Sequence, residues 1–348
     1  MTTLIKTALD DIVADPCWLP HRLDMGRRIV TFGRFNRDTL AKASFLDYRL
    51  EEAASAWTEA PVDALLNANT PARPAPAFLI HTSYCCSTLL ARALDVPGRA
   101  FALKEPNIIM DLSNAYRMAR DRNELDVADR LRDAILNLLA RPHMENERVL
   151  IKPTNAANNL APVISALGVP IIFLYSDLRG FLASVIKKGE PCRTIIRQIY
   201  RVFAMDKIGV SAIPQRDALA LTDLQIAALA WRHQIEMFNS MLLAPGGAHL
   251  RSLDFRTLLA RPAETLRAAS DHMQLGIDVE TLNATANGPI FQTDSKGERL
   301  RYDASQRARE EAALMDQHRD VLDLIELWAF KLSLWDHATA RLPKPLIE

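Results

Sequence analysis

Five short apolar runs constrain most strongly what this chain can fold into. Runs of this length and composition are typical of strands that are buried on both faces of a parallel sheet. They are Phe78-Leu-Ile-His-Thr, Phe101-Ala-Leu, Val149-Leu-Ile, Ile171-Ile-Phe-Leu-Tyr and Leu250-Arg-Ser-Leu. Helical patterns lie between them, as at residues 131–139 and 224–238. Strands that alternate with helices predict an α/β fold with a central parallel sheet covered by helices.

The stretch before the first of these runs has a different character. Residues 28–35 have the pattern of a strand, and three prolines among small residues at 67–76 resemble a connector. We therefore expect an N-terminal accessory segment at residues 1–75, most simply a structural flank, and an α/β domain at residues 76–348. The tail at 304–340 predicts one or two long helices.

Charge and composition exclude several classes of protein. The 348 residues contain 42 Lys and Arg against 42 Asp and Glu, so no global field attracts nucleic acid or an acidic membrane. No apolar run has the ~20 residues of a membrane helix, and the first residues lack the layout of a signal peptide. Four cysteines fit neither a disulfide framework nor a zinc site. We expect a cytoplasmic protein without a metal ion, in which any anion site is local.

The first apolar run leads into a turn of small and polar residues. This turn consists of Ser83, Tyr84, Cys85, Cys86, Ser87 and Thr88, and a helix follows it. A strand that turns through such residues into a helix directs free backbone N–H groups at one point, where they can hold phosphate. The hydroxyls of Ser87 and Thr88 add donors. The alternative is that Ser87 only caps the helix. The nucleoside triphosphatase motif G-x-x-x-x-G-K-[ST] is absent.

Charged side chains leave the second and third predicted strands. Lys104 and Glu105 precede Pro106, and Lys152 precedes Pro153. Because ligands of parallel sheets bind beyond the carboxyl ends of the strands, we expect these side chains to face the same cleft as the turn. A carboxylate and an ammonium there suit a general base and a charge stabiliser. Solvated surface charges are the alternative.

The fourth run continues into a helix with further polar residues. Ser176 and Arg179 follow the strand directly, and Ser184, Lys187 and Lys188 lie further along the helix. The two lysines either face the cleft or only complement the C-terminus of the helix, which is a favourable placement without function.

Together these segments resemble the sulfotransferase family over residues 78–330. The resemblance implies a three-layer P-loop-like fold and 3′-phosphoadenosine 5′-phosphosulfate as co-substrate. In the family, the loop after the first strand grips the 5′-phosphosulfate, a place that residues 83–88 occupy here. A glutamate base follows the second strand, where Glu105 stands. A lysine–proline pair follows the third strand, where Lys152 stands.

The resemblance extends to the 3′-phosphate site and to a closing loop. In the family, a strand ends in an arginine, Asp-Pro-Arg or a similar pattern follows, and a serine stands eight positions after the first arginine. Here Ser176 stands at the position of that arginine, and Arg179 and Ser184 fit the rest of the pattern. A glycine- and lysine-bearing loop closes over the nucleotide, and Lys296 and Arg299 stand in the matching segment.

Three positions depart from the family pattern. Tyr84 stands where the family carries lysine or arginine, Cys86 stands in place of glycine, and Ser176 replaces the arginine that reads the 3′-phosphate. Loss of one charge-assisted phosphate contact costs about 1.5–3 kcal/mol. We expect Arg179 or Arg193 to supply the missing charge at the 3′-phosphate.

The resemblance implies transfer of a sulfuryl group to a hydroxyl or amine of an unidentified small acceptor. Glu105 would take the proton of the acceptor. The amides of the loop, the hydroxyls of Ser87 and Thr88, and a lysine, Lys104 or Lys152, would stabilise the departing nucleotide. The acceptor pocket is expected along residues 107–120 and 198–206. Two alternatives stay open: a catalytically silent relative that binds a nucleotide or an anion, and an ATP-dependent phosphoryl-transfer enzyme.

Overall fold

A parallel sheet of five strands forms the centre of the computed structural model, which describes residues 4–68, 70–71, 73–206, 215–292, 304–332 and 341–348. The strands are β4 (Ala77–His81), β5 (Ala100–Lys104), β6 (Arg148–Lys152), β7 (Ile171–Tyr175) and β8 (Leu250–Asp254). Their order in the sheet is β5-β6-β4-β7-β8, and every neighbouring pair is parallel. All five predicted strands and the predicted α/β class are confirmed.

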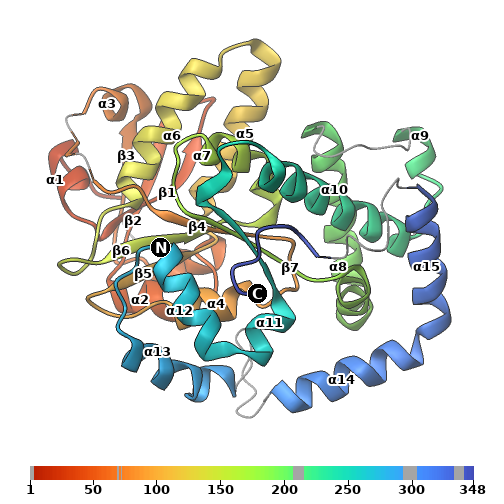
Figure 1. The fold of residues 1–348 in the computed structure, drawn as a ribbon. Helices are drawn as coiled ribbons and strands as arrows, with labels where there is room; N and C mark the ends of the chain where they lie inside the picture. The colour runs from red at the N-terminus through yellow and green to blue at the C-terminus, as the bar shows by residue number, and fades with distance from the viewer. Residues whose placement is uncertain (1–3, 69, 72, 207–214, 293–303, 333–340) are drawn as a thin grey trace.

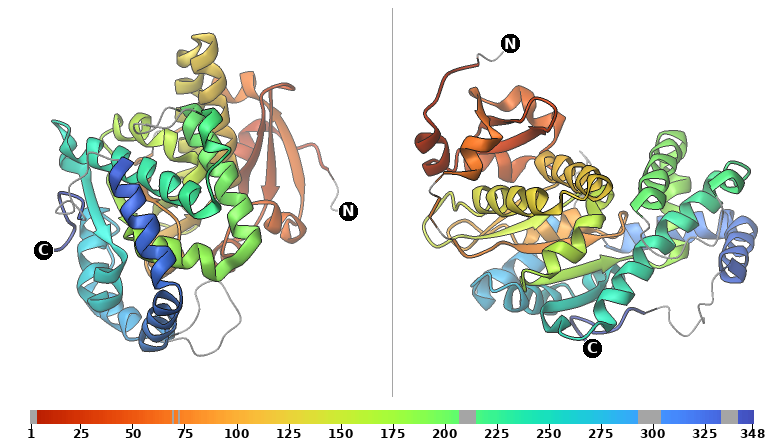
Figure 2. Two further views of the ribbon diagram at one scale, coloured as in Figure 1. Left: turned by 90° about the vertical axis from the view of Figure 1, so that its right-hand side faces the viewer. Right: turned by 90° about the horizontal axis from the view of Figure 1, so that it is seen from above.

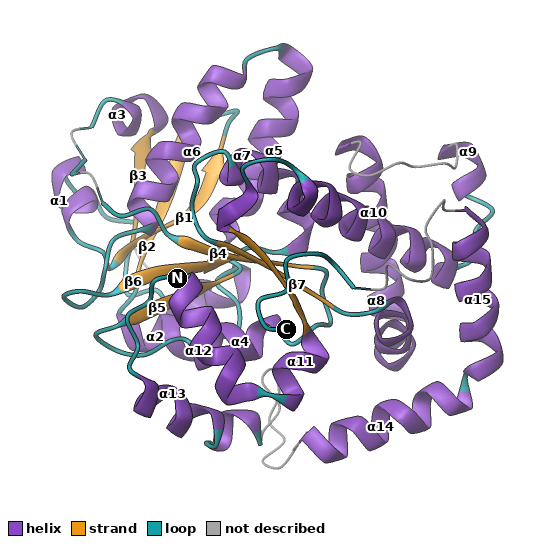
Figure 3. Ribbon diagram, viewed as in Figure 1, coloured by secondary structure: helices purple, strands orange, loops and turns teal. Residues whose placement is uncertain are grey.

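Two helical layers cover the sheet because its strands are apolar on both faces (Figure 3). Phe78 and Phe173 contribute to one core, and Leu79 and Ile172, their neighbours along the strands, contribute to the other. The helices of the first layer are α5 (Asn107–Arg122), α6 (Leu125–Leu139), α7 (Ala161–Ser165), α8 (Leu178–Asp206) and α10 (Asp223–Leu243). Those of the second layer are α4 (Ser87–Ala93), α11 (Phe255–Ala260), α12 (Pro262–His272) and α13 (Val279–Ala286). The three layers follow from this alternation (Figure 1).

Beyond these layers, the chain adds short helical turns and a helical tail. The turns are η2 (Asn155–Leu160), η3 (Gly247–His249) and η4 (Pro289–Phe291), and α9 (Gln215–Ala218) is a single short helix. The predicted tail forms α14 (Ala304–Gln317) and α15 (Arg319–Leu332). Within the described part of the chain, no helix combines the length and apolar character that crossing a membrane requires.

The N-terminal segment forms a second, antiparallel sheet. Its strands are β1 (Trp18–Asp24), β2 (Ile29–Arg34) and β3 (Trp57–Pro61), of which the sequence predicted only β2. Its helices are α1 (Leu9–Ala14), α2 (Arg37–Lys42), η1 (Tyr48–Ala53) and α3 (Val62–Leu66). The small sheet stands beside α5 and α6 (Figure 2) and shares an apolar core with them.

Backbone hydrogen bonds tie the N-terminal segment to the end of β5. The Leu46 N–H donates to the Lys104 carbonyl (2.7 Å), and the Asn107 N–H donates to the Leu46 carbonyl (3.0 Å). These bonds flank Glu105 in the sequence. The N-terminal segment therefore fixes the backbone at the predicted base.

Candidate functional site

The turn after β4 lies at the centre of the sheet. β4 has β6 on one side and β7 on the other, so chain crossovers leave in opposite directions near its carboxyl end. Open α/β sheets bind their ligands at such a switch point. The turn at residues 83–88 therefore occupies the expected place for a ligand.

Three residues of this turn have left-handed backbone conformations without being glycine. The φ angles are 74° at Ser83, 53° at Tyr84 and 61° at Cys86. Each such residue costs on the order of 1–3 kcal/mol unless its surroundings enforce the conformation. The backbone therefore makes a tight turn that contains no glycine.

Side chains of the turn anchor it to the surrounding strands and helices. The buried Cys85 thiol donates to the Leu174 carbonyl (3.4 Å), and burial raises the pKa of Cys85 to about 12. The Tyr84 hydroxyl forms a hydrogen bond with Cys192 Sγ (2.8 Å). Burial also raises the pKa of Tyr84, so both groups stay neutral at pH 7. Tyr84 and Cys85 thus hold the loop in place and carry no charge for an anion.

Two buried hydroxyls, one in the turn and one beside it, have no hydrogen-bond partner among the described residues. They are Thr88 Oγ1, in the first turn of α4, and Ser176 Oγ, directly after β7. The Ser176 N–H donates to Thr82 Oγ1 (3.4 Å), which places Ser176 next to the loop. Unsatisfied buried polar groups are uncommon and costly in folded proteins. Both hydroxyls therefore have unused hydrogen-bonding capacity at the turn.

Helix α4 begins without a side-chain cap. Cys86 is the N-cap residue and makes no capping hydrogen bond, and Ser87 is already the first helical residue. The alternative that Ser87 caps this helix is therefore wrong. The side chain of Cys86 is half-buried.

Glu105 and Lys152 form an ion pair at the carboxyl edge of the sheet. Lys152 Nζ donates to Glu105 Oε1, and the Glu105 N–H donates to the Lys152 carbonyl (2.6 Å). The Lys152 side chain is 1% exposed and the Glu105 side chain is 19% exposed. A buried ammonium needs a paired anion, and Glu105 is that partner for Lys152. The carboxylate is still reachable by a substrate.

His81 joins this ion pair to the turn, a role that the sequence analysis did not assign. Its Nδ1 accepts a hydrogen bond from the Ser83 N–H (3.0 Å), so the neutral ring carries its proton on Nε2. Nε2 lies 3.0 Å from the Pro153 carbonyl and 4.0 Å from Glu105 Oε1. The position of His81, at the end of the strand and two residues before the turn, was the available signal. His81 orients both the turn and the segment after Lys152.

Lys104 does not join the Glu105–Lys152 pair, which corrects the expectation that it faces the cleft. Its ammonium is fully buried and donates to the carbonyls of Leu40 (3.2 Å) and Ala41 (2.9 Å) on α2. Asp95 Oδ2 lies 3.8 Å away. Burial lowers the pKa of Lys104 to about 8. Lys104 therefore stabilises the packing of the N-terminal segment on β5.

The two candidate arginines for the 3′-phosphate pair with carboxylates of their own. Arg179 Nη1 lies 2.7 Å from Asp323 and 2.5 Å from Glu326, both on α15. Arg193 Nε lies 3.5 Å from Asp223. Neither guanidinium is thus an uncommitted charge beside the turn.

Of the other residues that the sequence predicted for the site, some lie on α8 and others lie outside the described residues. Lys188 of α8 lies above the Tyr84 ring, with Nζ 5.7 Å from the ring centre, and brings a positive charge to the turn. Ser184 is half-buried on the same helix. Lys296 and Arg299 lie outside the described residues. No cluster of three metal-ligating side chains occurs in the described ranges.

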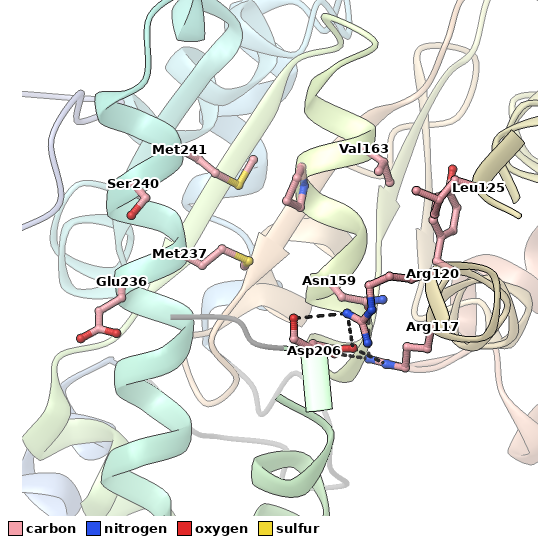
Figure 4. A pocket seen from close by; sticks show the side chains of 12 residues that line it. Arg117, Arg120, Leu125, Asn159, Val163, Asp206, Glu236, Met237, Ser240 and Met241 are labelled. Carbon is pink, nitrogen blue, oxygen red and sulfur yellow. Dashed lines mark hydrogen bonds and ion pairs between the residues drawn. The ribbon is translucent and has the colours of Figure 1, made fainter. Parts of the chain in front are cut away.

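A separate cavity of about 470 Å³ lies among α5, α7 and α10 (Figure 4). Arg117 and Arg120 of α5 and Asp206, the last residue of α8, line it. These residues belong to the two segments in which an acceptor pocket was expected. None of the lining residues belongs to the cluster of His81, Glu105 and Lys152.

Comparison with known proteins leaves the site to be interpreted from its own chemistry. No family model matches the chain, and a search of curated proteins finds no match. The resemblance to sulfotransferases therefore rests on the motifs of the sequence alone.

Proposed function

We propose that this chain is a sulfotransferase-like enzyme that uses 3′-phosphoadenosine 5′-phosphosulfate as the donor and a hydroxyl or amine as the acceptor. One observation carries the proposal: Glu105, Lys152 and His81 meet beside a P-loop-like turn at the carboxyl edge of the parallel sheet. A general base, a cation and an anion-binding backbone are the parts that sulfuryl transfer requires. The strand–loop–helix motif and its two unpartnered hydroxyls support the choice of an oxyanion as ligand.

In this proposal the sulfuryl group passes by in-line displacement. The Glu105 carboxylate accepts the proton of the acceptor hydroxyl or amine, and the acceptor atom forms a bond to sulfur. The bond between sulfur and the bridging oxygen of the donor breaks, and its electron pair stays on the 5′-phosphate. Lys152 stabilises that developing charge, and the hydroxyls of Thr88 and Ser176 donate to phosphate oxygens.

Lys188 replaces the charge that the family carries in the loop itself. It reaches the turn from α8 and lies over the ring of Tyr84. Tyr84 in turn is held by Cys192 on the same helix, beyond the kink at Gly189. A charge delivered from the neighbouring helix serves the same electrostatic purpose as a charge in the loop.

The compartment is part of the same proposal. All four cysteines are free thiols, at positions 17, 85, 86 and 192. Free thiols suit a reducing compartment, which supports a cytoplasmic location for the reaction.

A second candidate is a catalytically silent relative that binds a nucleotide or another anion. The ion pairs of Arg179 with α15 and of Arg193 with Asp223 favour it, because they engage both of the arginines that were expected at the 3′-phosphate. The two candidates share the turn and differ in whether Glu105 acts as a base.

Thermal-shift titration separates these candidates. We expect 3′-phosphoadenosine 5′-phosphate to raise the melting temperature, because a ligand that binds only the folded state stabilises by RT ln(1 + [L]/Kd). ATP and inorganic sulfate are the comparison ligands. A response to ATP in preference to the bisphosphate would favour phosphoryl transfer, and no response to any of the three would refute the anion site.

The variant Glu105→Gln then tests catalysis. Release of the bisphosphate is measured with a panel of phenols, alcohols and amines, and Glu52→Gln, at an exposed carboxylate of η1, is the matched control. We expect Glu105→Gln to lower turnover at least about 100-fold and to keep bisphosphate affinity nearly unchanged. Unchanged turnover would refute the role of Glu105, and bisphosphate binding without turnover in the unaltered chain would favour the silent relative.

A further inference from the structure

The cavity among α5, α7 and α10 has one polar wall and one apolar wall. The polar wall consists of Arg117, Arg120, Asn159 and Asp206. The apolar wall includes Val163 on α7 and Met237 and Met241 on α10. Figure 4 shows the two methionine side chains pointing from α10 toward the polar wall. The volume of about 470 Å³ lies within the range of small-molecule pockets.

Arg117 and Asp206 neutralise each other within the polar wall. Arg117 Nε and Nη2 donate to the two carboxylate oxygens of Asp206, each at 2.7 Å. Nη1 donates to Asn114 (2.8 Å), and Nη2 also donates to the Ala156 carbonyl (2.9 Å). The Asp206 carboxylate is fully buried. This ion pair forms a fixed part of the cavity wall that has no net charge. Its polar atoms are already hydrogen-bonded, so they offer little to a ligand.

Arg120 supplies the charge that a ligand can use. Its Nη1 donates to the Asp206 carbonyl (3.3 Å) and its Nη2 to the Met205 carbonyl (3.2 Å). A guanidinium has five N–H groups, so three have no hydrogen-bond partner among the described residues. Arg120 Nε lies 3.7 Å from Asp121, whose side chain is 72% exposed and outside the cavity, and Nη1 lies 4.0 Å from Asp206, which is hydrogen-bonded to Arg117. The polar wall therefore presents one positive charge, held in place by two backbone carbonyls.

The apolar wall carries no negative charge that would cancel Arg120. Glu236, the other acidic residue at the cavity, lies 2.6 Å from Arg232, one helical turn earlier on α10. Met237 and Met241 are flexible and polarizable, and such side chains adapt to apolar ligands of varied shape. The cavity therefore combines an adaptable apolar surface with a cation at its edge.

We propose that this cavity binds a small amphipathic anion: a carboxylate at Arg120, attached to an aliphatic body that lies against Met237 and Met241. The site goes beyond the proposed sulfuryl transfer, because it shares no residue with the cluster of His81, Glu105 and Lys152. The carboxylate receives charge-assisted hydrogen bonds from the free N–H groups of Arg120. The aliphatic body displaces water from the methionine wall.

Calorimetric titration of the full chain with three ligands of equal chain length tests the proposal. The probes are decanoate, decanol and decylamine, each below the concentration at which it aggregates. We expect decanoate to bind at least about tenfold more tightly than decanol, because a charge-assisted contact is worth that factor or more. Decylamine should bind least. Equal binding of all three, or no binding of decanoate, overturns the proposal.

Variants then assign the contact to Arg120. Arg120→Gln should bring the affinity for decanoate down to that for decanol, and Arg120→Lys should restore the preference for the anion. Arg122→Gln is the matched control, because Arg122 lies on the same helix but does not line this cavity. Met237→Trp should weaken the binding of both decanoate and decanol, because the larger side chain fills part of the cavity beside the apolar wall. Unchanged decanoate affinity in the folded Arg120→Gln protein would refute the assignment.

Discussion

Two lysines at the ends of neighbouring strands have opposite roles. Lys104 ends β5 and Lys152 ends β6, the two lie opposite each other in the sheet, and both are fully buried. Lys152 pairs with Glu105 beside the turn at residues 83–88. Lys104 instead donates to the carbonyls of Leu40 and Ala41 on α2. The same residue type at the same register is therefore part of a candidate site in one strand and of a structural contact in the next.

The two lysines show that the role of a buried lysine depends on the groups that accept its hydrogen bonds, and not on its position at the end of a strand. A buried ammonium must be compensated, and each lysine satisfies this requirement with the acceptors within its reach. For Lys152 the acceptor is a partly exposed carboxylate, which a substrate can also contact. For Lys104 the acceptors are two backbone carbonyls on α2, and the buried carboxylate of Asp95 lies 3.8 Å away.

The largest effect that we expect is on turnover. Lys152→Met should lower turnover at least about 100-fold, since loss of one preorganised donor to developing charge costs about that much. Lys104→Met should leave turnover per folded molecule nearly unchanged. The measurement is release of 3′-phosphoadenosine 5′-phosphate at a temperature below the melting points of both variants. Equal losses in the two variants would remove the distinction between the lysines.

A smaller effect is expected on stability. Lys104→Met should lower the free energy of unfolding by about 1–3 kcal/mol, because it leaves the Leu40 and Ala41 carbonyls buried without a donor. Urea denaturation followed by circular dichroism measures it. Lys42→Met, at the end of the same α2 helix, is the control and should change stability little. A neutral Lys104→Met would show that this contact contributes nothing.

The pH dependence of stability sharpens the same comparison. The pKa of Lys104 is about 8 in the folded chain against an ordinary value of 10.5, so between these values the unfolded chain binds more protons. The stability of the unaltered chain relative to Lys104→Met should therefore rise with pH from about 8 to 10.5, by up to about 1.4 kcal/mol per pH unit. This gain in stability relative to Lys104→Met is lost again as the pH falls toward 8. A difference that is independent of pH would contradict the lowered pKa.

The smallest effect concerns a hydroxyl beside the turn. Ser176→Ala should raise the stability of the ligand-free chain by about 1 kcal/mol, because it removes a buried hydroxyl without a partner. The same variant should weaken binding of the bisphosphate several-fold. Melting curves with and without the bisphosphate measure both changes. A gain in stability with unchanged affinity would assign Ser176 to packing alone.

The sheet could be predicted from the sequence because its signal is local. A run such as Ile171–Tyr175 is apolar throughout, and only a strand covered on both faces accommodates it. Strands β1 and β3 of the N-terminal sheet lacked this signal, because proline and charged residues interrupt their apolar patterns. β1 forms because its apolar side chains are buried against α5 and α6, and β3 forms because it pairs with β2 and packs against α3.

The candidate site was predictable as a location but not as a set of contacts. The strand ends indicated Glu105 and Lys152 as candidates, and the structure places these two side chains in one ion pair. No local pattern could show that α2 would capture Lys104 or that α15 would pair with Arg179. Such partners come from distant segments of the chain, and only the complete packing reveals them.

The strand order has a consequence for how the chain folds. Phe78 of β4 pairs with Ile151 on one side and with Ile171 on the other, so both neighbours of this strand come much later in the sequence. Contacts between distant segments must first overcome the entropy of closing long loops, which slows folding. During synthesis, the turn at residues 83–88 leaves the ribosome well before the strands that hold it. The turn therefore reaches its left-handed backbone conformation late in folding, after the neighbouring strands have paired with β4.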